Sequence, residues 1–577
     1  MITANLEYNI EKTKDNYIIL KIKKNDKWVY VGSKYNMKNS IDKFMEKNQE
    51  NEKDEEKIFI IFGFGTGDHI KELRKKYKNN IIIVFEPNEK LEEYISDLQW
   101  TKEDKKMQVL CCDEDALKNF MDNSLQIYNI HNLKLEYFEN YNKVYETEFM
   151  NFVKTIKDKL IAMEININTS TSYDIRWFET LTNNLPYIVN GTPAELYRDE
   201  YKNKPAVIVS AGPSLDKNID LLKDFGDKVV ILTGGRTLKP LMERNIKPNL
   251  LGAIDPSIES YKIMEEYVED CTAPLLFYDG TNENVLTAHK NEKIFFGNRA
   301  IVDRIAEDKI TNYCWGGSVA HALTVFSVVL GCNPIIFIGQ DFAYTNEKYY
   351  ADSSQHSSAR DMYIDSKGIY VEAVGGGTVR TDLVLESFRI SLEEIIAAMP
   401  NNLFINATEG GARIKGSKEM TLKETLEKYS CKEKINPIEK KKYPVNMKKN
   451  SIDILNEAKK AIEIIIDKCS EALKYLDKLE SYYKKNNDKK VNSILKKLDN
   501  IDKVIISNSK SIDIAESLVY PIIYDTMTTY ITLENRPDDE KMKAIIFNSN
   551  KFYRLLLKRL EYAREHLDET LDRIENN

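Results

Sequence analysis

Residues 204–215 read KPAVIVSAGPSL, a short apolar run followed at once by small and turn-forming residues. The run at 206–210 is typical of a buried strand, and Gly212 permits the close backbone approach of a tight turn. Pro213 presets the backbone for a first helical turn, and Ser214 adds a hydroxyl beside the free amides of a helix expected from Asp216 onward. The turn therefore predicts a seat for an anion. It is shorter than a Walker loop and lacks its lysine, which favours one phosphate over a triphosphate.

Other apolar runs of the same kind follow along the chain, at 229–233, 250–255, 275–279 and 335–341, with helical stretches between them. Strands that alternate with helices and are apolar throughout indicate a mostly parallel sheet covered on both faces. The fold class that we predict is α/β, with a Rossmann-like central domain at 166–430.

A smaller α/β domain, also Rossmann-like, is predicted at 1–165. It opens with a hairpin around Asn25-Asp26, and after a charged spacer at 46–57 it continues as strand, glycine-rich turn (63–67), helix and strand. This turn resembles the first motif of folds that bind nucleotides or methyl donors, with Glu86 about twenty residues downstream where an acid would hold a ribose. An architectural turn fits the pattern equally well.

The last part of the chain has a different texture. Apolar residues recur at every third or fourth position over 452–479, 491–506 and 542–574, with Lys and Glu between them. Such stripes are the core seams of packed helices. We therefore predict an α-helical bundle at 431–577.

The composition excludes several classes of protein. The chain has 577 residues, 42% hydrophobic and 30% charged, with no window near the roughly 20 apolar residues that span a bilayer. The amino terminus lacks the basic and apolar segments of a secretory signal, so we expect a cytoplasmic protein without a membrane partner. A net charge of −8 argues against binding to nucleic acid. The 7 scattered cysteines, without a Cys-x-x-Cys pair, argue against disulfides and structural zinc.

Further strand-end loops carry groups suited to the same ligand, because ligands of open parallel sheets bind beyond the carboxyl ends of the strands. Residues 316–318 precede a helix and offer a second cluster of amides for an anion, and Asp255 or Asp341 could accept hydrogen bonds from sugar hydroxyls. The predicted donor-binding residues are Gly212, Pro213, Ser214, Leu215, Gly234, Gly235, Arg236, Asp255, Gly316, Gly317 and Ser318.

The segments PAVIVSAGPSLDKNI, ILTGGRTLKPL, IKPNLLGAIDPS, GGSVAHAL and IGQDFAY resemble the motility accessory factor (Maf) family of flagellin glycosyltransferases. The resemblance covers roughly 190–420 and extends to the three-part layout. It implies transfer of a nonulosonic acid, a sialic-acid-like sugar such as pseudaminic or legionaminic acid, from its CMP-activated form to Ser or Thr hydroxyls of flagellin. That central domain is similar to bacterial sialyltransferases, whose Gly-Pro-Ser-Leu and Gly-x-Asp-Phe motifs match 212–215 and 339–342 and imply nucleotide binding there.

The resemblance also indicates catalytic groups. Related sialyltransferases use two tyrosines on the leaving phosphate, and Tyr344, Tyr349 and Tyr350 lie just past the Gly-x-Asp-Phe motif. We predict that Tyr344 acts with either Tyr349 or Tyr350. No cofactor is expected, since the CMP-sugar is the donor substrate.

The catalytic base is left open. The sialyltransferase pattern has a histidine shortly before a Thr-Asp segment, whereas none precedes Thr381-Asp382 here. His356, Asp341 and Asp255 are the candidates, and His321 is expected in the core. The Asp-x-Asp match at 113–115 lies in the first domain and is discounted, so we expect no metal and activity that survives chelation.

Two other functions fit parts of the chain. Archaeal pyrophosphokinases share the Gly-Pro-Ser-Leu domain and transfer diphosphate from ATP to a hydroxymethyl-dihydropterin, which would need Mg²⁺ and a triphosphate clamp. A flagellin-binding chaperone whose sugar site has decayed is the non-enzymatic alternative.

Overall fold

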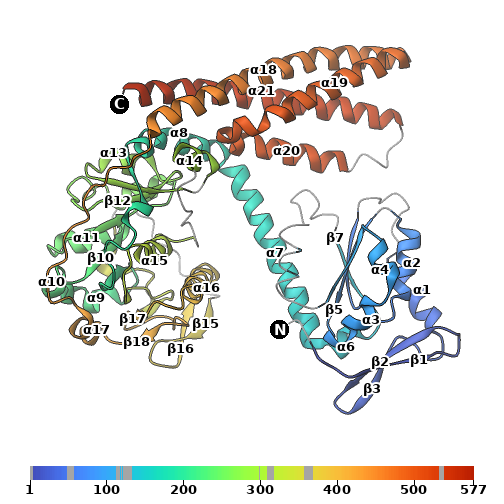
Figure 1. Cartoon of the computed structure of the whole chain (residues 1–577), viewed down its shortest axis with the longest axis horizontal. Helices are drawn as coiled ribbons and strands as arrows, with labels where there is room; N and C mark the ends of the chain where they lie inside the picture. Colours follow the sequence, from blue (N-terminus) through green and yellow to red (C-terminus); the bar gives the residue numbers. More distant parts are fainter. Residues whose placement is uncertain are drawn as a thin grey trace. The chain divides into compact units, whose positions relative to one another are not determined.

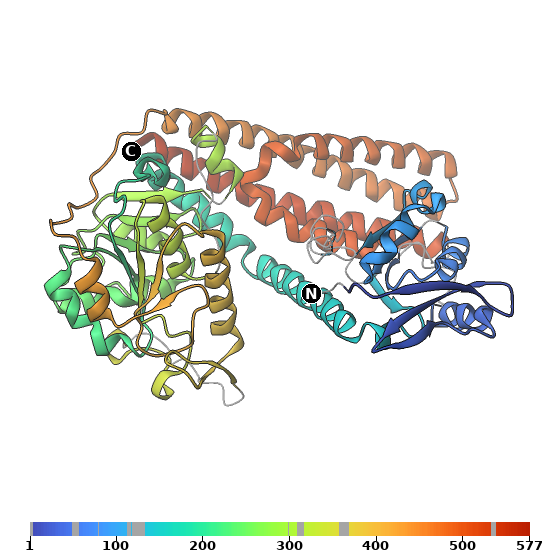
Figure 2. The same cartoon turned by 60° about the horizontal axis from the view of Figure 1, so that its bottom comes forward.

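The computed structural model describes residues 4–48, 57–78, 80–111, 117, 120, 133–297, 299–307, 317–356, 368–531 and 538–576. The chain forms two compact units (Figures 1 and 2). Unit 1 contains Met1–Asp174, Cys469–Ile501 and Leu518–Lys558, and unit 2 contains Ile175–Lys468, Asp502–Ser517 and Arg559–Asn577. The division into three domains made from the sequence stays a prediction.

Unit 1 begins with a hairpin and a small parallel sheet. Strands β2 and β3 pair antiparallel around Asn25-Asp26, both at positive φ, as the sequence predicts. The small parallel sheet has the order β6-β5-β4-β7, and β4 is buried along its whole length. The elements are β1 (Tyr8–Lys12), β2 (Ile18–Lys24), β3 (Lys27–Val31), α1 (Met37–Lys47), β4 (Ile58–Phe62), α2 (Asp68–Lys76), β5 (Ile81–Glu86), α3 (Glu92–Ser96), α4 (Gln99–Glu103), β6 (Met107–Cys111), β7 (Leu133–Tyr137), α6 (Tyr141–Val144) and α7 (Glu146–Ser172).

Unit 2 is built on a 9-stranded sheet of order β18-β17-β14-β9-β10-β11-β12-β13-β8, in which every pairing is parallel. Its strands are β8 (Thr192–Pro193), β9 (Ala206–Val209), β10 (Val230–Gly234), β11 (Leu250–Gly252), β12 (Leu275–Tyr278), β13 (Lys293–Phe296), β14 (Ile335–Ile338), β17 (Phe404–Asn406) and β18 (Lys418–Glu419). A separate hairpin pairs β15 (Ile369–Glu372) with β16 (Thr378–Thr381).

Helices cover both faces of this sheet, as the apolar strands predict. Alternate residues of one strand face opposite cores: Ala206 and Ile208 join one apolar cluster, Val207 and Val209 the other. Helix α15 packs across β9, β10, β11 and β14 (Figure 1). The helices are α8 (Asp174–Asn190), α9 (Leu215–Asn218), α10 (Leu222–Phe225), α11 (Gly235–Glu243), α12 (Ile258–Lys262), α13 (Glu283–Ala288), α14 (Ala300–Ile305), α15 (Val319–Val329), α16 (Leu383–Ala398) and α17 (Leu422–Tyr429).

The C-terminal part is helical, which confirms the predicted fold class. The predicted stripe on its first helix is buried at Leu455, Ile462, Cys469 and Leu476. The helices are α18 (Met447–Lys484), α19 (Asp488–Asn508), α20 (Glu516–Ile531) and α21 (Asp538–Asn576). No helix in the described part of the chain is both long and apolar enough to span a membrane.

Candidate functional site

The strand order gives the large sheet a topological switch point between β9 and β14. From β9 the chain proceeds through β10, β11, β12 and β13 on one side, and then crosses to β14, which pairs with β9 on the other. Neighbouring strands whose connections leave in opposite directions form a topological switch point, where open α/β sheets bind their ligands. The loops that end β9 and β14 carry the two motifs that the sequence analysis singled out.

These two loops lie in direct contact. The amide of Gly212 donates to the carbonyl of Gly339 over 2.7 Å, and the Ser210 hydroxyl donates to the Gln340 side chain over 2.5 Å. A Cβ on Gly212 would lie 2.2 Å from an oxygen of Asp341, and one on Gly339, at φ +61°, would lie 2.0 Å from the Ser210 carbonyl. Both glycines are therefore required by close approach of the two loops.

The predicted anion seat is filled by a side chain of the protein. Asp341 accepts from the Ser214 hydroxyl over 2.6 Å and from the Ser214 amide over 3.2 Å, and both residues are buried. Burial raises the pKa of Asp341, and the Ser214 bonds oppose that shift. The helix expected from 216 onward is also short, because the backbone leaves the helical φ at Asn218. The side-chain amide of Asn218 donates to the Ala407 carbonyl and to the Glu409 carboxylate. In this structure Ser214 and Asp341 join two loops, and their predicted roles in binding and catalysis stay predictions.

The predicted tyrosines form a row beside the Gly-x-Asp-Phe loop. The ring of Tyr349 lies 5.7 Å from that of Tyr344 and 4.8 Å from that of Tyr350. Tyr344 is buried, whereas its two neighbours are half-buried. Burial, and then the neighbouring phenol of Tyr350, raise the pKa of Tyr349, so its hydroxyl keeps its proton at neutral pH and can donate a hydrogen bond.

Arg236 and His356 lie at the Tyr350 end of this row. The guanidinium of Arg236, from the start of α11, lies 4.0 Å from the centre of the Tyr350 ring. His356 lies beside Arg236, with a hydrogen bond to the Arg236 backbone. Burial lowers the pKa of His356, and the charges of Arg236 and Lys239 lower it further, whereas the hydrogen bond opposes the shift. The structure thus brings together Tyr344, Tyr349, Tyr350, Arg236 and His356, which the sequence could only propose one by one.

Asp382 lies at the other end of the row and was not among the predicted site residues. Its carboxylate accepts from the Tyr344 hydroxyl over 2.5 Å and from the Leu385 amide, at the start of α16, over 2.7 Å. The Thr381 hydroxyl donates to the Phe342 carbonyl and fixes the same segment to the Gly-x-Asp-Phe loop. The sequence carries a signal for this residue, because Thr381-Asp382 matches the Thr-Asp segment of the sialyltransferase pattern, although the histidine of that pattern is missing.

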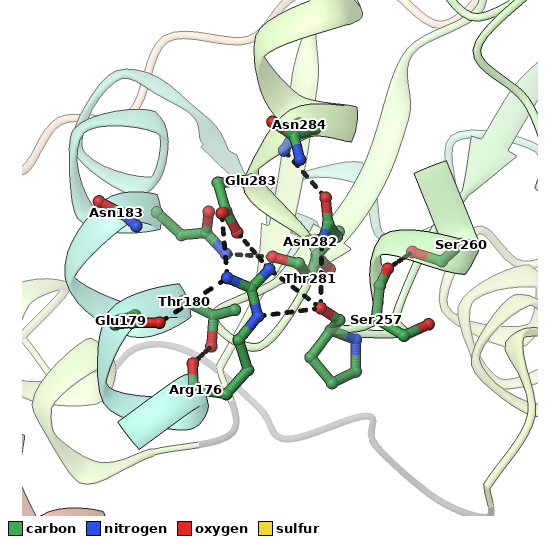
Figure 3. A network of polar contacts seen from close by, with 12 residues as sticks. Arg176, Glu179, Thr180, Asn183, Ser257, Ser260, Thr281, Asn282, Glu283 and Asn284 are labelled. Carbon is green, nitrogen blue, oxygen red and sulfur yellow. Dashed lines mark hydrogen bonds and ion pairs between the residues drawn. The ribbon is translucent and has the colours of Figure 1, made fainter. Parts of the chain in front are cut away.

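Asp255 belongs to a different network, at the ends of β11 and β12, where its carbonyl accepts from the Ser260 hydroxyl and the Asn282 amide. Asp255 is exposed and accepts from the Ser257 amide over 2.7 Å. Next to it, Arg176 of α8 binds both carboxylate oxygens of Glu283, at 3.1 and 2.8 Å, and the carbonyl of Pro256. Figure 3 shows the guanidinium between the two loops, which α8 thereby ties together.

The second predicted amide cluster is a helix cap. The Ser318 side chain accepts from the Ala320 amide, and the His321 ring accepts from the Ser318 amide, so these donors are bound within the chain. His321 is buried and binds the Phe388 carbonyl, which confirms the expectation that it lies in the core. Gly317 is exposed, and Gly316 lies outside the described residues. Gly234 and Gly235 lie at the junction of β10 and α11, where an added Cβ would meet Val319 and Met264 respectively.

The glycine-rich turn of unit 1 is closed by side chains. Glu86 has no exposed surface and accepts from the Phe64 amide, the Tyr141 hydroxyl and the Asn88 amide. The Gly65 amide donates to the Tyr141 hydroxyl over 2.7 Å, and a Cβ on Gly63 would lie 2.4 Å from the Tyr141 ring. The acid that would hold a ribose is therefore bound to the turn itself.

The described residues contain no cluster of three or more His, Cys, Asp or Glu side chains placed to hold a metal ion. The Asp-x-Asp match at 113–115 lies outside the described residues. The expectation of metal-independent activity stays a prediction.

The comparisons with known proteins agree with the resemblance that the sequence motifs carry. Residues 3–94 match the family model described as the glycosyltransferase Maf N-terminal domain. Residues 179–347 match the model described as 6-hydroxymethylpterin diphosphokinase MptE-like. The fold is similar to the structure of a Maf glycosyltransferase from Magnetospirillum magneticum AMB-1, with a TM-score of 0.59 and 11% identity over 99% of this chain and 94% of that chain. No curated protein sequence matches the chain.

The resemblance to Maf proteins is thus confirmed at the level of domains and fold. The match to the Maf N-terminal model includes the closed turn of unit 1, and the match to the MptE-like model includes both loops of the switch point. Tyr349, Tyr350 and Asp382 lie beyond the MptE-like match.

Proposed function

We propose that this protein is a glycosyltransferase that moves a nonulosonic acid from its CMP-activated form to Ser or Thr hydroxyls of flagellin. The observation that carries the proposal is the row of phenols beside the switch-point loops, with Arg236 at one end. The domain matches and the similarity in fold to a Maf glycosyltransferase support it.

The geometry suits a leaving nucleoside monophosphate. As the bond between the sugar and the phosphate breaks, negative charge develops on the phosphate, and hydrogen-bond donors and a cation stabilise it. Arg236 supplies the cation, and Tyr349 and Tyr350 supply half-buried phenols beside it. The Tyr344 hydroxyl already donates to Asp382, so Tyr349 and Tyr350 fit the phosphate better than Tyr344 does.

The test is transfer in a purified system, with CMP-pseudaminic and CMP-legionaminic acid as donors and unglycosylated flagellin as acceptor. Intact-mass spectrometry of flagellin should show addition of one or more nonulosonic acids. Tyr349→Phe and Tyr350→Phe should each lower kcat by about 10- to 100-fold, because each removes one donor to the phosphate. Tyr429→Phe is the matched control and should leave kcat unchanged. Flagellin that gains no mass with either donor would refute the proposal.

Two further arms follow from the same assay. Metal independence is part of the proposal, so activity should persist in EDTA, and rescue by Mn²⁺ after loss in EDTA would refute that part. Flagellin from a deletion strain should lack the sugar, whereas a normal glycan on unstable filaments would favour the chaperone.

A second candidate function rests on the match of residues 179–347 to the MptE-like model. By that alternative the chain would transfer diphosphate from ATP to 6-hydroxymethyl-dihydropterin. Incubation with ATP, Mg²⁺ and the pterin, followed by chromatography for AMP and the pterin diphosphate, distinguishes the two. We expect no AMP above background.

A further inference from the structure

Transfer to a hydroxyl requires a group that takes up the acceptor's proton, and the three bases considered from the sequence are poorly placed for this. Asp341 is 2% exposed and is bound by the Ser214 amide and hydroxyl. His356 lies at the cationic end of the row, beside Arg236, where the leaving phosphate is expected. Asp255 belongs to the loop network at the ends of β11 and β12.

Asp382 has the position that a base needs. Its carboxylate is half-buried and held at both oxygens, by Tyr344 on one side and by the first turn of α16 on the other. The row of rings from Tyr350 through Tyr349 to Tyr344 separates it from Arg236. Arg236 therefore lies at the end where negative charge is expected to develop, and the carboxylate of Asp382 lies at the opposite end.

The groups that face Asp382 are few in the described part of the site. Tyr344 donates to it, and its charge is among the causes that raise the pKa of Tyr349. The guanidinium of Arg380 lies 5.4 Å from the Tyr344 ring and is paired with Glu347, so that its charge is balanced on the other side.

We propose that Asp382 is the general base of the transfer reaction; the inference rests on the proposed function. The carboxylate of Asp382 takes the proton of the acceptor Ser or Thr hydroxyl as the oxygen forms a bond to the anomeric carbon of the sugar. The bond from that carbon to the phosphate oxygen breaks, and its electron pair leaves with CMP. Tyr344 is a positioning residue, which holds the carboxylate in one orientation through the hydrogen bond from its hydroxyl.

The decisive variant is Asp382→Asn. Asparagine caps a helix as well as aspartate does and can still accept from Tyr344, but it cannot take up a proton. We expect kcat to fall by about 100-fold or more, with KM for the CMP-sugar within about twofold of the wild type. Asp352→Asn is the matched control, because Asp352 is exposed and paired only with Lys348 in the described residues. It should retain wild-type kcat.

Azide separates a base from a structural residue, because this nucleophile has no proton to lose. Release of CMP by Asp382→Asn should return towards the wild-type rate in sodium azide, with the glycosyl azide as product. A slow variant that azide does not rescue would overturn the inference, and so would Asp382→Asn with wild-type kcat. If the variant loses its fold, the wild-type pH profile decides: kcat should fall at acid pH, as it does for reactions that depend on a carboxylate base, and a flat profile would overturn the inference.

Failure of the proposed function looks different. Wild-type protein that turns over neither CMP-pseudaminic nor CMP-legionaminic acid would refute the transferase itself, and the role of Asp382 with it. An active wild type with an equally active Asp382→Asn variant would refute only the base.

Discussion

Glu86 is a carboxyl group with no exposed surface, and burial raises its pKa to about 7 against the hydrogen bonds from Tyr141, Asn88 and Phe64. Its folded pKa lies above the unfolded value of 4.5, so the folded state holds the proton more tightly, and stability is lost as pH rises from 4.5 to 7. The difference corresponds to about 3 kcal/mol. Glu86→Gln cannot titrate, so we expect the free energy of unfolding of unit 1 to lose this part of its pH dependence.

Urea unfolding of both proteins at several pH values, followed by tryptophan fluorescence, measures the effect. His69 also titrates with a lowered pKa, of about 3, but it contributes equally to both proteins and cancels in the comparison. Parallel pH profiles for the two proteins would show that Glu86 stays ionised at neutral pH.

Ser214 gives a second prediction at this scale. Replacing it with alanine removes the hydroxyl that donates to the buried Asp341 carboxylate and keeps the hydrogen bond from the backbone amide of residue 214. We expect unit 2 to lose about 1–3 kcal/mol of stability. Ser387→Ala, at an exposed serine that binds only within its own helix, should change stability by less than about 0.5 kcal/mol. Equal urea midpoints for Ser214→Ala and the wild type would mean that the hydrogen bond from the Ser214 hydroxyl to Asp341 makes no net contribution to stability.

The limits of the sequence are clear for these residues. The turn at 212–215 and its place after a buried strand could be predicted, because apolar runs and turn residues are local signals. Its partner could not, because Asp341 lies 127 positions away and only the pairing of β9 with β14 brings the two together. A buried carboxylate that accepts a hydrogen bond from the amide at the start of a helix cannot be recognised from the local sequence.

At the scale of elements, Arg176 of α8 ties together the loops that follow β11 and β12, at the carboxyl ends of these strands. The ion pair with Glu283 is bidentate, and the two side chains are 30% and 24% exposed, so solvent screens it only partly. In a double-mutant cycle of Arg176→Gln and Glu283→Gln, we expect a coupling energy of about 1 kcal/mol that falls with added salt. The exposed pair Lys348 and Asp352 is the control, with less than about 0.5 kcal/mol. Coupling no larger than the control would contradict a role for the pair in holding the two loops together.

Three of the strands that the sequence analysis missed are very short. Strands β8, β17 and β18 have 2, 3 and 2 residues, too few for a periodic pattern. The hairpin of β15 and β16 contains three consecutive glycines at positive φ, which look like a loop in the sequence. That hairpin delivers Asp382 to Tyr344. The Thr381-Asp382 motif can be read from the sequence, but this contact depends on a hairpin that the local pattern does not predict.

At the scale of the whole molecule, the chain carries two glycine-rich turns after buried strands, one in each unit. Side chains fill both turns, Glu86 and Tyr141 in unit 1 and Asp341 in unit 2. The turn of unit 2 differs in its position, because it stands at a switch point beside phenols and a cation. The sequence alone could not choose between them, because both satisfy the same local pattern. The side chains that fill the first turn come from β5 and from α6, 76 positions beyond Gly65.

A nucleotide should therefore protect one turn and leave the other unchanged. At CMP concentrations about 100 times its dissociation constant, binding stabilises the folded state by about 2.7 kcal/mol. Amide hydrogen exchange should slow in peptides that cover 210–216, 234–237 and 339–350, because they carry the loops of the switch point and the row of phenols. Peptides that cover 62–68 should exchange at the same rate with and without CMP, since their amides at 64 and 65 are already bound by Glu86 and Tyr141. Cytidine measures nucleoside binding without the phosphate. Protection of 62–68 alone would move the nucleotide to unit 1 and remove the basis for a transferase site in unit 2.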